Sequence, residues 1–463
     1  MSVQLRNTLG RTTVTLGTPT ERPLGLYTCG PTVYGVAHLG NLRTYVFEDV
    51  LKRVLQTAGY RVKHVMNVTD VGHLVGDQDA GADKVEEQAK REHRSAHDIA
   101  RHYEQVFFRD LAQLGIIPPD VILRATETIS DQIALVKQIE AKGFTYTTSD
   151  GVYFDTAKLP SYGAMSGQGR EAKQAGARIA VNDEKKHPAD FALWKLSRPE
   201  EHRQMEWPSP WGVGYPGWHL ECSAMSIREF PYGLDIHCGG IDHIPVHHEN
   251  ERAQNEAAGH PDFVKIWMHG EFLVLPEKRM GKSEGNSITL DEVITRGIHP
   301  LAYRYLCLQS HYRSPLTFRW EALEAAHRGL VDLWRHIDRL PIGGDGVPRE
   351  MEQFRTAIED DLNTPRALAI MHHALEATSD PVDRVATLEY FDRVLGLQLA
   401  PDPARTAART QAIPPEVQTM MTERDAARQA KDFTRADLMR QHLESAGYDV
   451  MDGPNGTTVR RRL

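Results

Sequence analysis

Apolar runs and helically spaced apolar residues alternate near the N-terminus. Residues 24–28 form an apolar run that leads into the turn-forming stretch Cys29-Gly30-Pro31-Thr32. Between Leu42 and Ala58 the apolar residues recur at helical spacing, and Gly59 provides a stop. The valine-rich residues 60–70 are predicted to form a second strand. A strand–helix–strand unit this short predicts a parallel sheet in a doubly wound, Rossmann-like α/β domain that binds a nucleotide.

The pattern then changes several times and divides the chain. Residues 84–115 are charged and helical in pattern, whereas residues 145–215 lose periodicity and collect Gly, Pro and Trp, which indicates an irregular insertion. A helical pattern fills residues 329–399, and a Pro-rich linker follows. We predict five segments: a first catalytic half (1–124), an insertion (125–215), a second catalytic half (216–328), an α-helical bundle (329–400) and a small C-terminal module (401–463).

Composition narrows the class of protein. Of the 463 residues, 40% are apolar and 25% charged, which is ordinary for a soluble globular chain. The sequence contains no apolar run of the roughly 20 residues that a membrane span needs and no signal-peptide pattern, so we expect a cytoplasmic protein. Four cysteines are too few for a disulfide scaffold. The net charge of −9 excludes a global basic field for nucleic acid.

A candidate phosphate site lies between the first predicted strand and helix, at His38-Leu-Gly40-Asn41. Helix N–H groups and the positive end of the helix dipole meet a phosphate at such a position. Gly40 would let the backbone approach the nucleotide, and His38 and Asn41 could donate hydrogen bonds. An ordinary turn with a solvated histidine is the alternative for so short a string.

A second candidate is the loop Arg279-Met-Gly281-Lys282-Ser283. Gly281 and the following Gly285 allow mobility, and a lysine there can neutralise charge on a departing phosphate. The loop lacks the spacing of a Walker P-loop, and a solvated basic loop is the alternative. Together the two stretches resemble the HIGH and KMSKS motifs of class I aminoacyl-tRNA synthetases. That resemblance implies a split Rossmann-like catalytic domain.

A possible metal site is predicted around His247 and Glu251, which lie four residues apart and share a face on a helix. A charged helix face is the alternative for that pair alone. Cys222 and Cys29 add two thiols, and two thiolates, one imidazole and one carboxylate suit tetrahedral zinc.

These residues resemble cysteinyl-tRNA synthetases specifically, and the similarity covers nearly the whole chain. The motifs are Tyr27-Thr-Cys-Gly-Pro-Thr-Val-Tyr34, Asn67-Val-Thr-Asp70, Gly217-Trp-His-Leu-Glu-Cys-Ser-Ala-Met225, Asp235-Ile-His237 and His247-His-Glu-Asn-Glu251. The resemblance implies zinc ligands at Cys29, Cys222, His247 and Glu251. It implies substrate contacts at Cys29, Gly30, Thr69, Trp218 and His237, for which a core role is the alternative. It also implies an α/β fold of class I type, split by an insertion and followed by a helical bundle and a C-terminal anticodon-binding module.

Three departures from the family pattern stand out. The basic loop has Arg279 where lysine is usual and Gly281 where serine is usual. Residues 71–83 carry acids that only superficially resemble a calcium loop, so we expect a solvated loop. Cys238 replaces a typical glycine and stands near His237 and His243, although we do not expect a second metal there.

The resemblance implies that L-cysteine is activated by ATP, with Mg²⁺, and transferred to tRNA(Cys) by a monomer. Catalytic roles would fall to His38, Asn41 and Lys282, and ATP contacts to these residues with Gly40 and Ser283. One rival function is a cysteine ligase that passes the adenylate to a small amine such as an aminosugar, and another is a catalytically silent tRNA-binding protein. Against the small-amine ligase, the C-terminal module carries a predicted basic helix face: Arg424, Arg428, Lys431 and Arg435. A solvated helix face is the alternative for that pattern.

Overall fold

The structure, a computed structural model, describes residues 2–71, 83–167, 184–198, 203–276, 286–376, 380–403, 405, 414–453 and 456–461. Within these residues no helix is long and apolar enough to cross a membrane.

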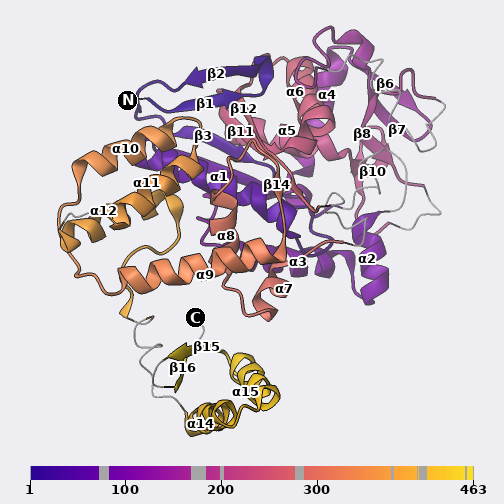
Figure 1. Ribbon diagram of the computed structural model, residues 1–463. Coiled ribbons are helices and arrows are strands. Elements are labelled where there is room, and N and C mark those ends of the chain that lie inside the picture. Colours follow the sequence, from indigo (N-terminus) through magenta and orange to yellow (C-terminus); the bar gives the residue numbers. More distant parts are fainter. Residues whose placement is uncertain are drawn as a thin grey trace.

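A five-stranded parallel sheet lies at the centre of the catalytic part (Figure 1). Its strand order is β12-β11-β3-β4-β5. The strands are β3 (Leu24–Thr28), β4 (Val62–Val68), β5 (Val121–Arg124), β11 (Leu234–Gly240) and β12 (Val264–Gly270). Three strands precede the insertion and two follow it, so both halves of the chain build one sheet. The predicted split, doubly wound α/β fold is confirmed.

Helix α1 (Leu39–Thr57) connects β3 to β4 and packs on this sheet. It begins three residues before the periodic stretch because His38 caps it, and its apolar face is buried, including Val46, Val50 and Val54. The β3–α1–β4 unit is therefore the predicted one. Its topology puts the N-terminus of α1 at the carboxyl edge of the sheet, where nucleotide ligands bind in folds of this type.

The insertion is a second sheet, and the prediction of an irregular segment was wrong. Its antiparallel order is β6-β7-β8-β10-β9. The strands are β6 (Thr145–Thr148), β7 (Gly151–Phe154), β8 (Phe191–Leu196), β9 (Trp207–Ser209) and β10 (Gly212–Pro216), and α4 (Ile129–Ala141) precedes them. Every residue of β7, and all but the last of β8, is buried. Strands buried on both faces show no apolar–polar alternation, so the sequence pattern did not reveal these strands.

Helices connect and flank these sheets. Residues 84–115, predicted to be helical, form two helices, α2 (Lys84–Glu92) and α3 (Ala96–Gln113). They are separate because His93 adopts a left-handed conformation (φ 54°). Near the site lie α5 (Trp218–Glu229), the one-turn π-helix η7 (Ile244–His248) and α6 (Glu249–Ala258). After them come α7 (Leu290–Thr295), α8 (Pro300–Leu308) and a bundle of α9 (Trp320–Ile337), α10 (Pro348–Glu359), α11 (Thr364–Glu376) and α12 (Pro381–Leu395).

The C-terminal module is a small α/β unit with its own core (Figure 1). It consists of α14 (Pro415–Gln429), α15 (Phe433–Ser445), β15 (Tyr448–Gly453) and β16 (Gly456–Arg461). The two strands pair antiparallel and form a hairpin. Its core contains Val417, Leu443, Tyr448, Val450 and Val459.

Candidate active site and metal centre

The four residues predicted to bind a metal converge at the carboxyl edge of the parallel sheet. Cys29 follows β3, Cys222 lies in α5, and His247 and Glu251 lie four residues apart across the junction of η7 and α6. Their donor atoms all lie within 4.8 Å of one another, and all four side chains are buried. The Cys29 and Cys222 sulfurs are 4.0 Å apart. Two thiolates on a tetrahedral zinc ion, each about 2.3 Å from the metal, lie about 3.8 Å apart, so the spacing fits such an ion.

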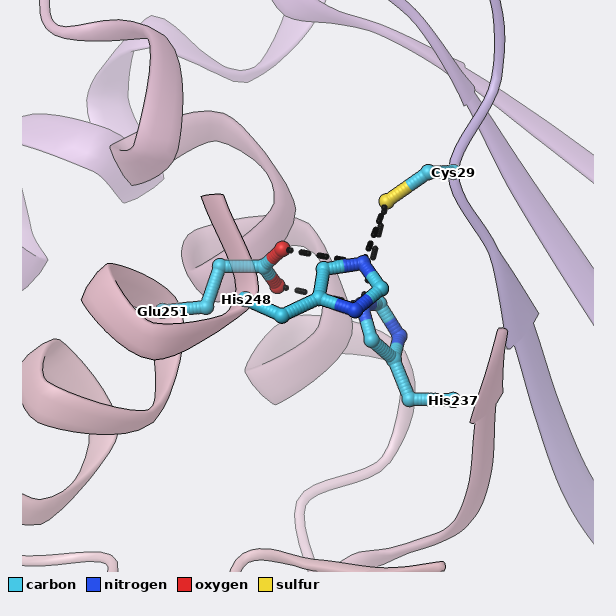
Figure 2. Close-up of side chains that lie close together, drawn as sticks. All are labelled: Cys29, His237, His248 and Glu251. Atoms are coloured by element: carbon cyan, nitrogen blue, oxygen red, sulfur yellow. Dashed lines mark hydrogen bonds and ion pairs between the residues drawn. The ribbon is translucent and has the colours of Figure 1, made fainter. Parts of the chain in front are cut away.

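Cys29 and Glu251 also belong to a second donor set, with His237 and His248 (Figure 2). The Cys29 sulfur is 3.2 Å from His248 Nε2 and 3.8 Å from His237 Nε2. The two oxygens of Glu251 face different rings: Oε2 is 3.3 Å from His237 Nε2, whereas Oε1 is 3.0 Å from His247 Nε2. The sequence analysis did not predict His248 as a donor. Two adjacent histidines, His247 and His248, could have suggested it.

Charges within the cluster shift the pKa values of its members in opposite directions. Burial alone would raise the pKa of Glu251, but the neighbouring His237 and His247 outweigh it and lower it to about 2. Burial would lower the pKa of His247, but Glu251 and Cys222 raise it to about 10. Burial and then the hydrogen bond and charge of Cys222 raise the pKa of the Cys29 thiol well above its usual value. A cation in this cluster would replace protons that the donors otherwise hold.

Further hydrogen bonds fix the orientation of the two imidazole donors. His247 Nδ1 lies 3.0 Å from His219 Nδ1, and His248 Nδ1 lies 2.7 Å from His269 Nε2. His269 Nδ1 in turn contacts the Thr8 hydroxyl at 2.7 Å. Metal-ligating histidines usually engage their second ring nitrogen in this way. These partners come from three distant segments, and sequence reasoning missed them.

The predicted substrate-binding residues surround this cluster. The Trp218 ring is half-buried and its centroid lies 4.4 Å from that of His247. His237 contributes to the second donor set, and Thr69 is buried against Glu221. Gly30 must be glycine, because an added Cβ would lie 1.6 Å from the Asn67 carbonyl oxygen. Neither Cys238 nor His243 is in either donor set, among the residues that the structure describes.

The candidate phosphate site is a reciprocal helix cap. The Asn41 N–H donates to His38 Nδ1 (3.1 Å), and the His38 N–H donates to Asn41 Oδ1 (3.2 Å). Because Nδ1 accepts, the neutral ring carries its proton on Nε2, the form that can donate to a phosphate. Both side chains are accessible, and Gly40 lies between them on the first turn of α1.

The basic loop lies outside the described residues, and so do Arg279, Gly281, Lys282, Ser283 and most of the acidic stretch, residues 72–82. The chain is described again from Asn286. There the Leu39 N–H donates to the Ile288 carbonyl (2.8 Å), and Thr289 pairs with His38. The segment that follows the loop therefore adjoins the N-terminus of α1.

Comparison with known proteins supports the same interpretation. Residues 17–328 match the family of class I tRNA synthetase (C) catalytic domains, and residues 410–460 match the cysteinyl-tRNA ligase anticodon-binding domain. Cysteine–tRNA ligase 1 of Burkholderia lata is 46% identical over 434 residues, which cover 94% of this chain and 91% of that one. The cysteine–tRNA ligase of Treponema denticola is 40% identical over the full length of both chains.

The chain belongs to the cysteine–tRNA ligase family. It is thus a class I aminoacyl-tRNA synthetase by family, and the aminosugar alternative has no support. The Mycobacterium tuberculosis methionyl-tRNA synthetase in complex with methionyl-adenylate shares the fold, with a TM-score of 0.55 at 14% identity, covering 85% of this chain and 95% of that one.

One residue of the predicted basic face, Arg424, lies inside the anticodon-binding module, whereas Arg428, Lys431 and Arg435 are exposed on its surface. Arg424 is 2% exposed and donates to Asp452 (2.7 Å) and Thr457 (2.6 Å). Arg428 pairs with the same Asp452 at 2.6 Å, and Arg435 lies 3.7 Å from Glu423. Helical spacing placed these arginines on α14 and α15, but the acids that neutralise them lie on β15 and on the facing helix.

Proposed function

We propose that this chain activates L-cysteine with ATP and transfers it to tRNA(Cys), using one Zn²⁺ held by Cys29, Cys222, His247 and Glu251. The observation that carries the proposal is the buried cluster of two thiols, an imidazole and a carboxylate. The cluster lies at the sheet edge where the capped N-terminus of α1 also begins. Soft sulfur donors with imidazole and carboxylate favour zinc over the harder divalent cations.

Zinc in this position would supply a soft Lewis acid that takes up a thiolate in preference to the hydroxyl of serine. A purely apolar pocket separates such near-isosteres poorly, so the donor set accounts for the choice of amino acid. We assign the remaining contacts to cysteine to Gly30, Thr69, Trp218 and His237, which lie around the cluster.

The phosphate end of the reaction is assigned to α1 and to the basic loop. Backbone N–H groups at the N-terminus of α1 bind phosphate oxygens, with Gly40 allowing close approach, and the His38 and Asn41 side chains add donors. The cysteine carboxylate attacks the α-phosphorus of ATP, which enters with Mg²⁺, and pyrophosphate leaves. Lys282 and Ser283 then stabilise the charge that develops on the departing group. In the second step a terminal ribose hydroxyl of the tRNA attacks the carbonyl carbon, and AMP leaves.

Two assays test the proposed reaction. Cysteine-dependent exchange of pyrophosphate into ATP is expected without tRNA, and a base-labile cysteinyl ester is expected when bulk tRNA is added. The resemblance also implies that the protein is cytoplasmic and monomeric. Size-exclusion chromatography can check the oligomeric state. Exchange without any ester on tRNA would contradict the assigned acceptor, and absence of exchange would contradict the activity itself.

The metal assignment has a separate test that distinguishes the two donor sets. Cys222→Ser is expected to lower the zinc content of the purified protein and raise the KM for cysteine in the exchange assay, because sulfur is the better zinc donor. His248→Asn is the matched comparison, since His248 belongs only to the second set. Unchanged zinc in Cys222→Ser, with zinc lost in His248→Asn, would move the ion to the second set.

A further inference from the structure

A chain of three hydrogen bonds joins the residue after Cys29 to the residue before Cys222. The Gly30 N–H donates to Asn67 Oδ1 (2.8 Å), the Asn67 side-chain amide donates to the Thr69 hydroxyl (3.2 Å), and that hydroxyl donates to Glu221 Oε2 (2.6 Å). Asn67, Thr69 and Glu221 are 2%, 1% and 0% exposed.

The chemistry of its two ends sets the direction of this chain. A backbone N–H can only donate and a carboxylate can only accept. Gly30 therefore fixes which way the Asn67 amide points, and Glu221 fixes which way the Thr69 proton points. The two links between side chains are buried, so breaking either one leaves a polar group without its partner away from water.

Backbone hydrogen bonds already attach Thr69 to the loop that carries Cys29. The Thr69 N–H donates to the Pro31 carbonyl (3.0 Å), and the Val33 N–H donates to the Thr69 carbonyl (3.1 Å). The loop after β3 and the end of β4 thus form one unit at Thr69. The Thr69–Glu221 bond connects this unit to α5, the helix that carries Cys222.

We propose that Glu221 is a positioning residue that holds, through Thr69 and Asn67, the Cys29 loop at the distance from Cys222 that a metal bound by both thiols requires. The proposal rests on the zinc site assigned above. The two sulfurs belong to separate elements and lie 4.0 Å apart, so their spacing depends on what joins those elements. Thr69 then supports the metal site indirectly, through the Cys29 loop and Glu221, in addition to its assigned contact with cysteine.

The test measures release of Zn²⁺ from the purified full-length enzyme to a chromophoric chelator. Glu221→Leu and Thr69→Val break the link to α5 and are expected to release zinc at least ten times faster than the wild type. Thr69→Ser keeps the hydroxyl and is expected to stay within a factor of two. Glu221→Gln keeps an oxygen that accepts the Thr69 hydrogen bond and is expected to lie between wild type and Glu221→Leu.

Ser226→Ala is the matched control on α5. Ser226 is also buried and donates to the Ser223 carbonyl (3.0 Å), but it lies outside the chain, so zinc release at the wild-type rate is expected. A Co²⁺-loaded sample gives a second reading, since a weakened thiolate pair reduces the sulfur-to-metal charge-transfer band in Glu221→Leu and not in Ser226→Ala.

Wild-type release from Glu221→Leu, or equal release from Thr69→Ser and Thr69→Val, overturns the proposal. If Glu221→Leu does not fold, the Thr69 pair decides the matter, because valine and serine differ from threonine by a single group. Loss of zinc from Cys222→Ser without any effect of the Thr69 and Glu221 variants contradicts this inference alone. Full zinc retention by Cys222→Ser contradicts the metal assignment on which it rests.

Discussion

Several histidine rings lie around the candidate metal site, and burial favours the neutral form of three of them. Burial, reinforced by neighbouring rings, lowers the pKa of His248 and His269 well below the usual value and that of His243 to about 4. His247, beside Glu251 and Cys222, has instead a pKa raised to about 10. Neutral imidazole is the form that binds a metal, so His247 would have to release a proton when a cation binds, whereas His248 would not.

His64 provides a pH-dependent contribution to stability away from that site. Burial, and then the charge of Lys52, lower its pKa from 6.5 to about 3. The unfolded chain therefore binds a proton between these pH values that the folded chain does not, so stability falls as the pH drops below 6.5. From pH 7 to pH 5 we expect His64 to account for a loss of about 2 kcal/mol in the free energy of unfolding.

Urea unfolding of the wild type and of His64→Gln at both pH values measures this contribution. Glutamine can keep a hydrogen bond to the Thr28 hydroxyl, which His64 Nε2 contacts at 2.9 Å. The variant is expected to lose less stability than the wild type on acidification. An equal loss in both proteins would show that His64 does not titrate as its burial requires.

How far single residues could be predicted depended on whether the sequence itself places them together. His247 and Glu251 share a helical spacing, and Cys29 and Cys222 followed from the resemblance. All four converge as expected. His248, His269 and Glu221 were missed because their contacts join segments that are far apart in the sequence. His248 on η7 contacts Cys29 after β3 and His269 on β12, and Glu221 on α5 contacts Thr69 after β4, so only the packing of the sheet brings them together.

Among the elements, α8 is fastened to three other segments by one buried arginine. Arg304 is 0% exposed, and its Nη2 lies 2.6 Å from Asp49 Oδ2 on α1. Its Nε donates to the Leu395 carbonyl at the end of α12 (2.6 Å), and its Nη1 donates to the Leu114 carbonyl after α3 (3.3 Å). The catalytic sheet's first helix and the helical bundle are thereby joined by a single side chain.

Arg304→Met is expected to lower the free energy of unfolding by about 2–4 kcal/mol, because the Leu395 and Leu114 carbonyls lose a buried charged donor while Asp49 keeps its pair with Arg53. Arg335→Met is the control: Asp332, its partner at 2.8 Å, is 69% exposed, so a change of less than about 1 kcal/mol is expected. Chemical unfolding monitored by circular dichroism compares the two. Similar small losses in both variants would mean that α8 is held mainly by its apolar contacts.

Helices and strands were predictable from the sequence where one face is buried and the other is exposed to solvent. Helix α1 satisfies that condition, and its periodicity was visible. Strands β7 and β8 do not, because buried residues occupy both faces, and the sheet of the insertion went unrecognised. The break between α2 and α3 was equally hidden, since His93 carries no sequence signal for its left-handed conformation.

For the whole molecule, the helical bundle and the C-terminal module are connected to the catalytic part in different ways. One large core contains residues of α1, α8 and the bundle helices α9 to α12. The catalytic part and the bundle therefore share buried apolar surface. The C-terminal module has a separate small core, and the chain leading to it is attached by Arg405, which donates to Asp338 (2.9 Å) and lies over the Trp334 ring. The domain boundaries stated from the sequence remain predictions.

Because the described core residues of the module are separate from those of the rest, removing the module is expected to separate the two half-reactions. A chain ending at residue 413 keeps Arg405 and its contacts with Asp338, so the catalytic part should fold with an unchanged unfolding midpoint. Cysteine-dependent pyrophosphate exchange should stay within about twofold of the full-length rate, since the donor cluster and the cap of α1 are intact. Charging of tRNA should fall by at least about tenfold, the factor that corresponds to losing about 1.4 kcal/mol of binding to the acceptor. If charging persists at the full-length rate, the module does not bind the acceptor; if exchange is lost while the midpoint is unchanged, the module contributes to the first step.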